Sequence, residues 1–409
     1  MFNRIFVVLL LGFSSGLPFS LVGSTLQAWY ADQGLSILTI GLLGLVGQPY
    51  VFRFLWAPLM DRFIPNRFGR RRGWILIAQA GLVCGLLLMS MMSPQQQTWL
   101  LAFFALGLAV LSASQDIAID AYRTEILKDN ENGLGASAAV LGYRVATLLS
   151  GGLSLIMAQY LGWGPTYQIM ALIMLAMLAV TFFIKEPSVT VHHESFTQSF
   201  INPFKELLMR EKGLLVLIFI FFYKLGEAFT STSSGMVNAF LLQDLHFDLA
   251  TVGLVNKVFG ITAIMLGSLT AGFIMLRLSL FKALLYFGLL QAVTNILFII
   301  LAVNAKSTSL LVLAVVGDNL AAGMGTTAIV AFMMWWINKS YTASQFALLS
   351  AIAALPRVLA GPITGLIQPS IGWVHFFELA FLLALPCLFV LVYLRPTAIE
   401  HEKAGLDFK

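Results

Sequence analysis

Long apolar stretches, separated by short polar loops, recur along almost the whole sequence. A helix that crosses the hydrocarbon core of a bilayer needs roughly 20 consecutive, predominantly apolar residues. Such stretches lie near 5–30, 37–60, 74–92, 97–121, 135–160, 165–184, 213–240, 249–275, 280–302, 309–335, 344–368 and 373–394. These twelve stretches predict an all-α membrane protein with twelve transmembrane helices.

The scarcity of charge supports the same prediction. Charged residues make up 11% of the 409 residues, against about 25% in soluble domains. We therefore expect the lipid bilayer to surround most of the chain. The net charge of +5 is carried by short loops and does not indicate nucleic-acid binding. Cys84 and Cys387 stand in apolar runs, so they predict neither a metal site nor a disulfide framework, and no cofactor is expected.

The distribution of basic residues predicts the orientation in the membrane. The N-terminus, the even-numbered loops, a central polar segment and the C-terminal tail hold 18 of the 24 Lys and Arg residues, whereas the odd-numbered loops hold only Lys306. Because basic loops stay in the cytoplasm, both termini should be cytoplasmic. We expect a first bundle at 1–184, a cytoplasmic linker with a short interfacial helix at 185–212, a second bundle at 213–394 and a tail at 395–409.

The two halves resemble each other at an offset near 210 residues. The segment GLPFSLVGSTLQAW, which begins at Gly16, parallels GEAFTSTSSGMVNAF, which begins at Gly226. The dipeptide Gly-Trp at 162–163 recurs at 372–373. Two pseudo-symmetric six-helix halves with the same orientation are the architecture of major facilitator transporters, whose substrate site lies between the halves near the midplane.

The loop after the second apolar stretch reads APLMDRFIPNRFGRRRG, from Ala57 to Gly73. It resembles the signature of the major facilitator superfamily, Gly-x-x-x-Asp-Arg-x-Gly-Arg-Arg, although Ala57 replaces the first Gly and IPNRF is inserted. The loop is therefore either a gate or a basic anchor that holds this end of the protein in the cytoplasm. The candidate gating residues are Asp61, Arg62, Arg70, Arg71, Asp120 and Arg123.

Charged side chains inside the predicted helices are the sharper functional signal. They are Arg53, Arg144, Lys224, Lys257, Arg357, Asp116, Glu227, Asp318 and Glu378. Each costs about 2.5–3.5 kcal/mol at the centre of a transmembrane helix. We therefore expect these groups to face one another or a water-filled cavity, and the alternative is purely structural pairing within the bundle.

Polar stripes at helical spacing favour a cavity. Lys224, Glu227, Ser231, Ser234 and Asn238 share one face of the seventh predicted helix, and shorter polar stripes occur in the first and eleventh. Small polar residues alone would indicate helix packing, but long polar side chains are not explained in that way. The candidate substrate-binding residues are Gln27, Gln48, Tyr50, Arg144, Lys224, Asn238, Lys257, Asp318 and Arg357.

Acidic residues in the fourth predicted helix suggest proton coupling. Asp116 lies about a turn and a half inside the membrane. A carboxyl group at that depth can bind and release a proton, and we predict this role for Asp116 together with Glu227. The alternative for Asp116 is a static ion pair with Arg144. Asp120, one turn towards the cytoplasm, would be solvated or paired with Arg123.

Enzyme signatures are weak. The run His192-His193-Glu194 lacks the spacing of a helical zinc site and has no second set of ligands, so it is expected to be a solvated charge run. There is no GxSxG motif, P-loop or dinucleotide fingerprint. We therefore predict that the protein is not an enzyme, although a membrane enzyme is the rival from another class.

Several sequence blocks, together and in order, resemble the AmpG-type anhydromuropeptide permease family of the major facilitator superfamily. The blocks are GFSSGLPFSLVGSTLQAW, VGQPYVFRFLWAPLMDRF, SASQDIAIDAYRTE, LGYRVATLLSGGLSL, FYKLGEAF, RLSLFKALLYFGLLQ and SQFALLSAIAALPRVLAGPITG. The resemblance covers about residues 8–394. The aspartate of the family's SQD motif falls on Asp116, and the lysine of its YKLG motif falls on Lys224.

The resemblance implies a proton-coupled importer in the inner membrane of a Gram-negative bacterium. Its substrates would be N-acetylglucosamine–anhydro-N-acetylmuramyl peptides, which serve cell-wall recycling and, in some bacteria, β-lactamase induction. Its partners would be this small molecule, protons and the lipid bilayer, and a monomer is expected. Pro49 and Pro356 stand where a small residue is expected in the family. The alternative is a major facilitator transporter for another bulky solute, such as a siderophore or a drug.

Overall fold

The computed structural model describes residues 4–35, 39, 42–65, 68–187, 196–230, 237, 240–304 and 306–394. Over these ranges the chain is helical and has no strand. Nine described segments are long and apolar enough to cross a bilayer: Arg4–Tyr30, Arg70–Ser90, Thr98–Ile126, Asn132–Leu161, Trp163–Phe183, Thr251–Ile274, Leu280–Val303, Thr308–Trp336 and Leu366–Leu394. The expected all-α membrane fold is therefore confirmed.

The helices of the first half of the chain are α1 (Arg4–Val22), α2 (Ser24–Asp32), α4 (Gln48–Phe52), α5 (Ala57–Arg62), α6 (Arg70–Ser90), α7 (Thr98–Ile126), α8 (Asn132–Thr147), α9 (Ser154–Leu161), α10 (Trp163–Phe183) and α11 (Phe196–Met209). Those of the second half are α12 (Gly213–Ala228), α14 (Leu249–Leu254), α15 (Ile261–Ile274), α16 (Leu280–Val303), α17 (Thr308–Trp336) and α18 (Thr342–Ala384). Tighter or wider helical turns occur at η1 (Leu43–Gly47), η2 (Arg53–Leu55), η5 (Leu148–Leu153) and η8 (Val255–Gly260).

The second apolar stretch is built from short helical pieces. Pro49 and Pro58 each stand in the first turn of a new piece, α4 and α5. Proline has no backbone N–H to donate, so it begins a helical segment more readily than it continues one. The breaks place Arg53 in the turn η2, at an irregular point of the backbone.

The described chain forms two compact units. Unit 1 comprises Met1–Lys205 and Met334–Ala351, and unit 2 comprises Glu206–Met333 and Ile352–Lys409. The end of α17 and the beginning of α18 thus belong with the helices of the first half of the sequence. This grouping determines which side chains can meet within unit 1.

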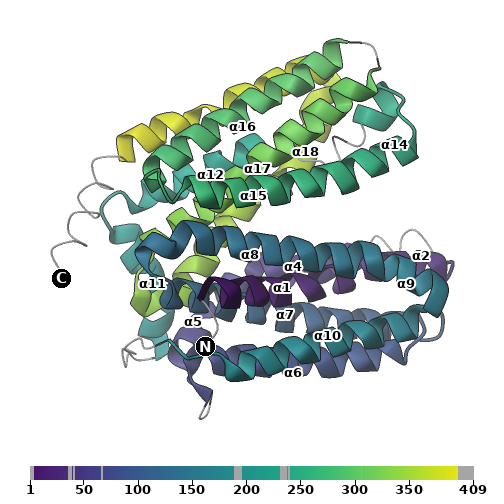
Figure 1. Cartoon of the computed structure of the whole chain (residues 1–409), viewed down its shortest axis with the longest axis vertical. Coiled ribbons are helices and arrows are strands. Elements are labelled where there is room, and N and C mark those ends of the chain that lie inside the picture. The colour runs from purple at the N-terminus through teal and green to yellow at the C-terminus, as the bar shows by residue number, and fades with distance from the viewer. Residues whose placement is uncertain are drawn as a thin grey trace. The chain divides into compact units, whose positions relative to one another are not determined.

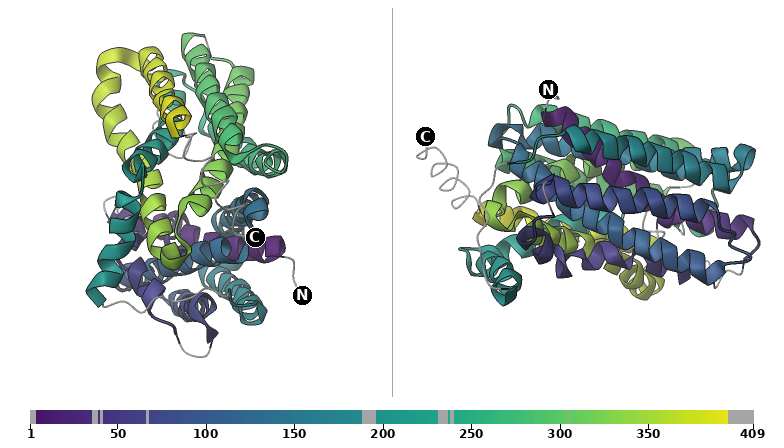
Figure 2. Two further views of the ribbon diagram at one scale, coloured as in Figure 1. Left: turned by 90° about the vertical axis from the view of Figure 1, so that its left-hand side faces the viewer. Right: turned by 90° about the horizontal axis from the view of Figure 1, so that it is seen from below.

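In unit 1, α1 packs along α7 and α8, and α6 packs against both α7 and α10 (Figure 1). The long helices of this unit run along one common direction in the views of Figures 1 and 2. Glycines allow the closest approach, because a Cβ on Gly142 would lie 2.1 Å from the carbonyl oxygen of Leu9. Leu17, Leu86 and Met170 are fully buried in the core between these helices.

In unit 2, α15 and α17 approach each other closely. A Cβ on Gly267 would lie 2.1 Å from the carbonyl oxygen of Leu320, so only glycine fits there. Aromatic rings fill another part of the unit, with the Phe377 ring centroid 5.1 Å from that of Phe240 and 5.4 Å from that of Phe298. These rings and neighbouring aliphatic side chains form the core of the unit.

The repeated Gly-Trp dipeptide has the same backbone turn in both halves. Gly162 has φ 85° between α9 and α10, and Gly372 has φ 76° at the kink inside α18. Such positive φ values favour glycine, which lacks a Cβ. The following tryptophans stack on aromatic neighbours, Trp163 on Trp29 and Trp373 on Phe377.

The central polar segment contains a helix, as the pattern of SFINPFKELLMRE predicts. This helix is α11, which continues through Pro203. Leu207 is fully buried, while Leu208 and Met209 are exposed. The helix is therefore confirmed, and its position at a membrane surface stays a prediction.

Candidate functional site

A fully buried arginine lies at the centre of the loop that resembles the superfamily signature. Arg71 donates through Nη2 to Asp61 Oδ1 at 2.7 Å and to Glu125 Oε1 at 2.6 Å. Arg70 also contacts Glu125, at 3.1 Å. Because burying an unpaired charge is costly, the close carboxylates are what allow Arg71 to be buried. Asp61, Arg70 and Arg71, three candidate gating residues, therefore lie together, and we call them with Glu125 the signature cluster.

Asp61 also holds the beginning of α18. Its Oδ2 accepts hydrogen bonds from the backbone N–H of Ser344 at 2.8 Å and from the Ser344 hydroxyl at 2.5 Å. Its Oδ1 accepts a further bond from the N–H of Ala343 at 3.2 Å. The first N–H groups of a helix have no partner within that helix, and a carboxylate there also interacts favourably with the helix dipole. One side chain thus joins α5, α6 and α18 within unit 1.

Sequence reasoning missed two acidic residues at this site. Glu125 ends the sequence block SASQDIAIDAYRTE, but its role as a partner of both Arg70 and Arg71 was not predicted. Glu186, just after α10, accepts hydrogen bonds from the backbone N–H groups of Arg71 and Arg72 at 2.8 and 2.9 Å. A run of three arginines at a helix start was the available signal that acidic partners would be needed.

A second group of charges surrounds Arg53, and we call it the Arg53 cluster. Arg53 lies 3.6 Å from Asp116 and 3.3 Å from Asp120, and Arg123 pairs with Asp120 at 2.9 Å. Asp116 also accepts a hydrogen bond from the Ser15 hydroxyl at 2.5 Å. The expected pairing of Asp120 with Arg123 is confirmed. The expected alternative partner of Asp116, Arg144, is wrong: the ion pair is formed with Arg53, which the break at η2 brings beside α7.

Both clusters touch the same segment of α18. Arg53 Nη2 donates to the Ser350 hydroxyl at 2.7 Å. The guanidinium of Arg123 lies 5.2 Å from the ring centroid of Phe346, a cation–π contact. Together with Ser344, these residues occupy successive turns at the beginning of the helix. Segment 342–351 is therefore held in unit 1 at several points by the candidate gating residues Asp61 and Arg123 and by Arg53.

In unit 2, charged side chains face one another as expected. Lys224 Nζ donates to the carboxylate of Glu227 one turn further along α12, and to the Thr326 hydroxyl at 3.1 Å. Arg357 of α18 lies 3.4 Å from the other carboxylate oxygen of Glu227. Glu227 is 8% exposed and Arg357 is 50% exposed. The predicted helical spacing thus brings Lys224 and Glu227 together, and Arg357 joins them from a distant part of the sequence.

A separate polar group in unit 2 is uncharged apart from Asp318. The Asp318 side chain on α17 lies 2.9 Å from the Thr230 hydroxyl, which lies 3.2 Å from Asn295 Oδ1. Asn295 Nδ2 donates to the carbonyl oxygen of Gly226 at 3.2 Å. All three side chains are buried. Neither Thr230 nor Asn295 was a predicted site residue.

The remaining candidates are dispersed. Tyr50 is partly buried with its ring edge against Phe19, 5.1 Å between centroids. Gln27, Arg62 and Arg144 are partly buried and Gln48 is exposed. Asn238, His192, His193, Glu194 and the side chain of Lys257 lie outside the described part of the chain. Within that part, no group of three or more His, Cys, Asp and Glu side chains could hold a metal ion.

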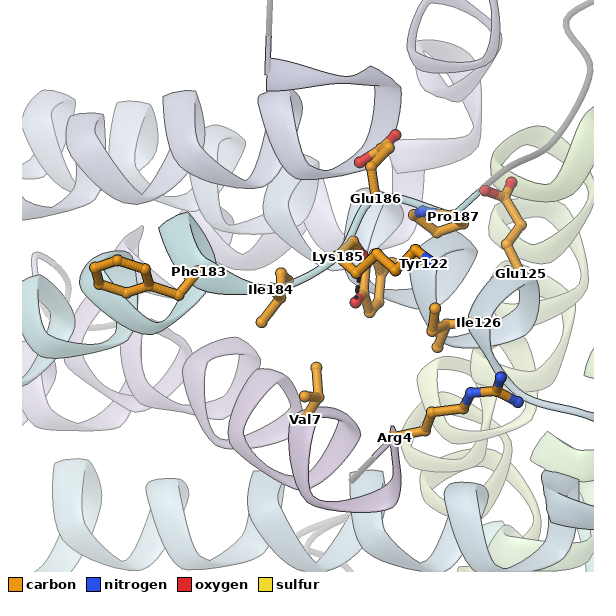
Figure 3. Close-up of a pocket in the computed structure, with 10 residues that line it drawn as sticks. All are labelled: Arg4, Val7, Tyr122, Glu125, Ile126, Phe183, Ile184, Lys185, Glu186 and Pro187. Atoms are coloured by element: carbon orange, nitrogen blue, oxygen red, sulfur yellow. Dashed lines mark hydrogen bonds between the residues drawn. The ribbon is translucent and has the colours of Figure 1, made fainter. Parts of the chain in front are cut away.

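A cavity of about 490 Å³ opens beside the signature cluster in unit 1 (Figure 3). Figure 3 shows side chains from the first turns of α1, the last turns of α7 and the chain that follows α10 around it. Its lining residues are Arg4, Val7, Tyr122, Glu125, Ile126, Phe183, Ile184, Lys185, Glu186 and Pro187. None of the predicted substrate-binding residues is among them.

Comparisons of sequence show the family context. A family model described as the Major Facilitator Superfamily matches residues 8–232. The chain is 41% identical to the anhydromuropeptide permease of Escherichia coli (strain K12), over 98% of this chain and 82% of that protein. It is 36% identical to an uncharacterized protein of Haemophilus influenzae, over 96% of this chain and 95% of that protein.

Solved structures of other transporters have the same fold as this chain. A bacterial homologue of the iron transporter ferroportin in an outward-facing state matches with a TM-score of 0.72 and 11% identity, over 95% of this chain and 98% of that chain. The fucose:proton symporter of Escherichia coli matches with a TM-score of 0.72 and 13% identity, over 96% of this chain and 97% of that chain. At such low identities, the likeness concerns the fold alone.

Proposed function

Because the chain belongs to the anhydromuropeptide permease family of the major facilitator superfamily, we propose that it imports anhydromuropeptides across the bacterial inner membrane. The observation that carries this proposal is the 41% identity to the Escherichia coli permease over 98% of the chain. The chain is accordingly a multi-pass membrane transporter and not an enzyme. Both termini lie in the cytoplasm in this proposal, and a monomer carries out the transport.

Proton coupling in this proposal involves Asp116 and Glu227. Asp116 lies 3.6 Å from Arg53, so its ion pair is looser than a direct charge-assisted hydrogen bond. Protonation of Asp116 would weaken this pair and leave Arg53 to Asp120 and Ser350. In unit 2, protonation of Glu227 would release Lys224 and Arg357 from their shared partner. Each protonation therefore changes which partners the neighbouring lysine and arginine side chains can bind.

The substrate would be bound by long polar side chains. A disaccharide-peptide is bulky, polar and anionic, and therefore needs cations and hydrogen-bond donors in a wide site. Arg357, half-exposed on α18, can receive a carboxylate while it remains near Glu227. The other proposed contacts are Gln27, Gln48, Tyr50, Arg144, Lys224, Asn238, Lys257 and Asp318.

The signature cluster would serve as the gate, with Asp120, Arg123 and the adjacent Arg62 as its other members. Alternating access requires contacts that form in one state and break in the other. The carboxylate of Asp61 satisfies the first N–H groups of α18 only while segment 342–351 lies against α5 and α6. Movement of this segment would remove the Ala343 and Ser344 donors from Asp61 and leave its carboxylate with Arg71. The cluster thus stabilises the conformation in which segment 342–351 lies against α5 and α6, while still allowing the segment to move.

Uptake into proteoliposomes tests the proposal. Vesicles with the purified protein and an alkaline interior should accumulate labelled disaccharide-peptide above the external concentration, and a protonophore should abolish the accumulation. Asp116→Asn should exchange substrate without responding to the pH gradient. Glu378→Gln is the matched control, because Glu378 is half-exposed and its ion pair in the described part of the chain is with exposed His375. Uptake by Asp116→Asn that still depended fully on the gradient would contradict this role.

Competition identifies the substrate class. Unlabelled anhydromuropeptide should displace the labelled substrate, whereas siderophores and drugs should not. Displacement by a siderophore or a drug with comparable potency would favour the other bulky solute. Breakdown of the substrate by the protein in detergent, without compartments, would favour an enzyme.

A further inference from the structure

Asp318 is a buried acid with neutral neighbours in its immediate contacts. Its side chain is 1% exposed, and the Thr230 and Asn295 side chains around it are fully buried. The three residues come from α17, from the turn that follows α12, and from α16. All of them belong to unit 2. The group is therefore one connected network within a single packed body.

The hydrogen bonds of Asn295 fix the direction of this network. A backbone carbonyl can only accept, so the atom of Asn295 that contacts the Gly226 carbonyl at 3.2 Å is its Nδ2. The amide oxygen Oδ1 then faces the Thr230 hydroxyl at 3.2 Å. Because Oδ1 cannot donate, the single hydroxyl proton of Thr230 is used in this contact.

The contact between Thr230 and Asp318 needs a second proton. Their oxygens are 2.9 Å apart, which is a hydrogen-bond distance. An ionised carboxylate has no proton to donate, and the Thr230 proton is already directed at Asn295. With a proton on Asp318, the acid would donate to Thr230, Thr230 would donate to Asn295, and Asn295 donates to the Gly226 carbonyl. This order gives every one of the contacts a donor and an acceptor.

The surrounding charges favour the same protonation state. Glu227 is the charged group that acts on Asp318, and it is of like sign. Lys224 and Arg357 pair with Glu227, and the ion pairs of the described residues include none to Asp318. The only other charged residue of α16 or α17 is Lys282, in the first turn of α16, and α15 has none. Among the described side chains Asp318 has no cationic partner, and a buried carboxylate in that setting is costly, so a neutral acid is favoured.

We propose that Asp318 is a further proton-binding site, beside Asp116 and Glu227, which holds a proton in this state through the chain of hydrogen bonds to Thr230, Asn295 and Gly226. Release of that proton would leave Thr230 with two acceptors and one proton, so one of its contacts would break. The loss would loosen the end of α12 from α16 or α17. A role of Asp318 in transport rests on the proposed function, whereas the protonation of Asp318 does not depend on it.

Infrared spectroscopy of the protein in lipid tests the protonation directly. The wild type should show a carbonyl band of a protonated carboxylic acid that shifts when aspartate carries ¹³C in its carboxyl group. Asp318→Asn should lose this band, because asparagine has no carboxylic acid. The hydrogen-bond network should remain, since the amide nitrogen can donate to Thr230 in place of the acid proton. Asp116→Asn and Glu378→Gln should keep it. Equal aspartic acid bands in the wild type and Asp318→Asn would overturn the proposal.

Transport assays test what the proton does. Asp318→Asn should lose accumulation driven by a pH gradient to a greater extent than it loses exchange of substrate across the membrane, and the exchange rate also reports any loss of its proposed contact with substrate. Accumulation equal to that of the wild type would overturn the coupling role. Thr230→Ser should keep both the infrared band and the accumulation, whereas Thr230→Val should shift the band. An unshifted band in Thr230→Val would overturn the network. A wild type that transports no muropeptide would contradict the proposed function alone, since the infrared result does not use substrate.

Discussion

Asp61 links the signature cluster to the beginning of α18. One carboxylate meets a fully buried guanidinium, two backbone N–H groups and a serine hydroxyl. A neutral amide of the same shape cannot accept all of these bonds, because its nitrogen only donates. The negative charge of Asp61, as well as its size, is therefore needed at this point.

Asp61→Asn should destabilise unit 1 and impair uptake. Glu125 still pairs with Arg71 in the variant, so we expect a loss of about 1–3 kcal/mol, the cost of leaving buried polar groups without a partner. Thermal unfolding in detergent measures the stability, and proteoliposome uptake measures the activity. Glu378→Gln should change neither, since exposed ion pairs contribute little. An unfolding midpoint equal to that of the wild type would show that the buried contacts of Asp61 carry no net stability.

At the scale of helices, close packing depends on glycine. The backbone of α8 reaches that of α1 at Gly142 and Gly12, where a Cβ would meet carbonyl oxygens of the other helix. In a membrane, such close van der Waals contact replaces part of the hydrophobic driving force available in water. These contacts place Ser15 of α1 where it can bond Asp116 of α7.

Gly142→Ala should separate α1 from α8. The added methyl group would lie 2.1 Å from the Leu9 carbonyl oxygen, so the helices must move, and we expect destabilisation of about 1–3 kcal/mol. Gly107→Ala is the matched control within α7, because nothing lies within 4 Å of its Cβ position. Alanine is the better helix former by about 1 kcal/mol, so the control should be neutral or slightly more stable. Equal unfolding midpoints for Gly142→Ala and its control would count against close packing at this crossing.

At the scale of the whole molecule, the compact units do not follow the order of the chain. Residues Met334–Ala351 belong with unit 1, although the rest of α17 and α18 belongs to unit 2. The same segment carries Ser344 and Phe346, which contact the candidate gating residues Asp61 and Arg123, and Ser350, which contacts Arg53. The chain therefore passes from one unit to the other inside helices, namely α11, α17 and α18.

The predicted orientation is tested by the accessibility of single cysteines. In a background without Cys84 and Cys387, Lys306→Cys should react in bacterial spheroplasts with a maleimide that cannot cross membranes. Lys128→Cys should react only after permeabilisation, because basic loops remain cytoplasmic. Both lysines are exposed, so burial does not limit the reaction. Labelling of Lys128→Cys in intact spheroplasts would contradict cytoplasmic termini.

The membrane fold and the family could be predicted from the sequence because both depend on local patterns. Apolar stretches identify bilayer helices without knowledge of their neighbours, since each helix satisfies its own backbone hydrogen bonds. Spacing along one helix was likewise enough to pair Lys224 with Glu227. The signature loop brought Asp61, Arg70 and Arg71 to attention, and the structure brings them together.

Tertiary structure alone decided which distant residues meet. The partner of Asp116 is Arg53 and not Arg144, because breaks at Pro49 and Pro58 redirect the second apolar stretch beside α7. Glu125 and Glu186 became partners of the arginine run, and Thr230 and Asn295 enclosed Asp318. The sequence by itself determined that the helices lie in a membrane and which family the chain belongs to, because both follow from local composition and motifs. The pairing of buried charges depends on how helices cross, and crossing is set by contacts between residues far apart in the chain.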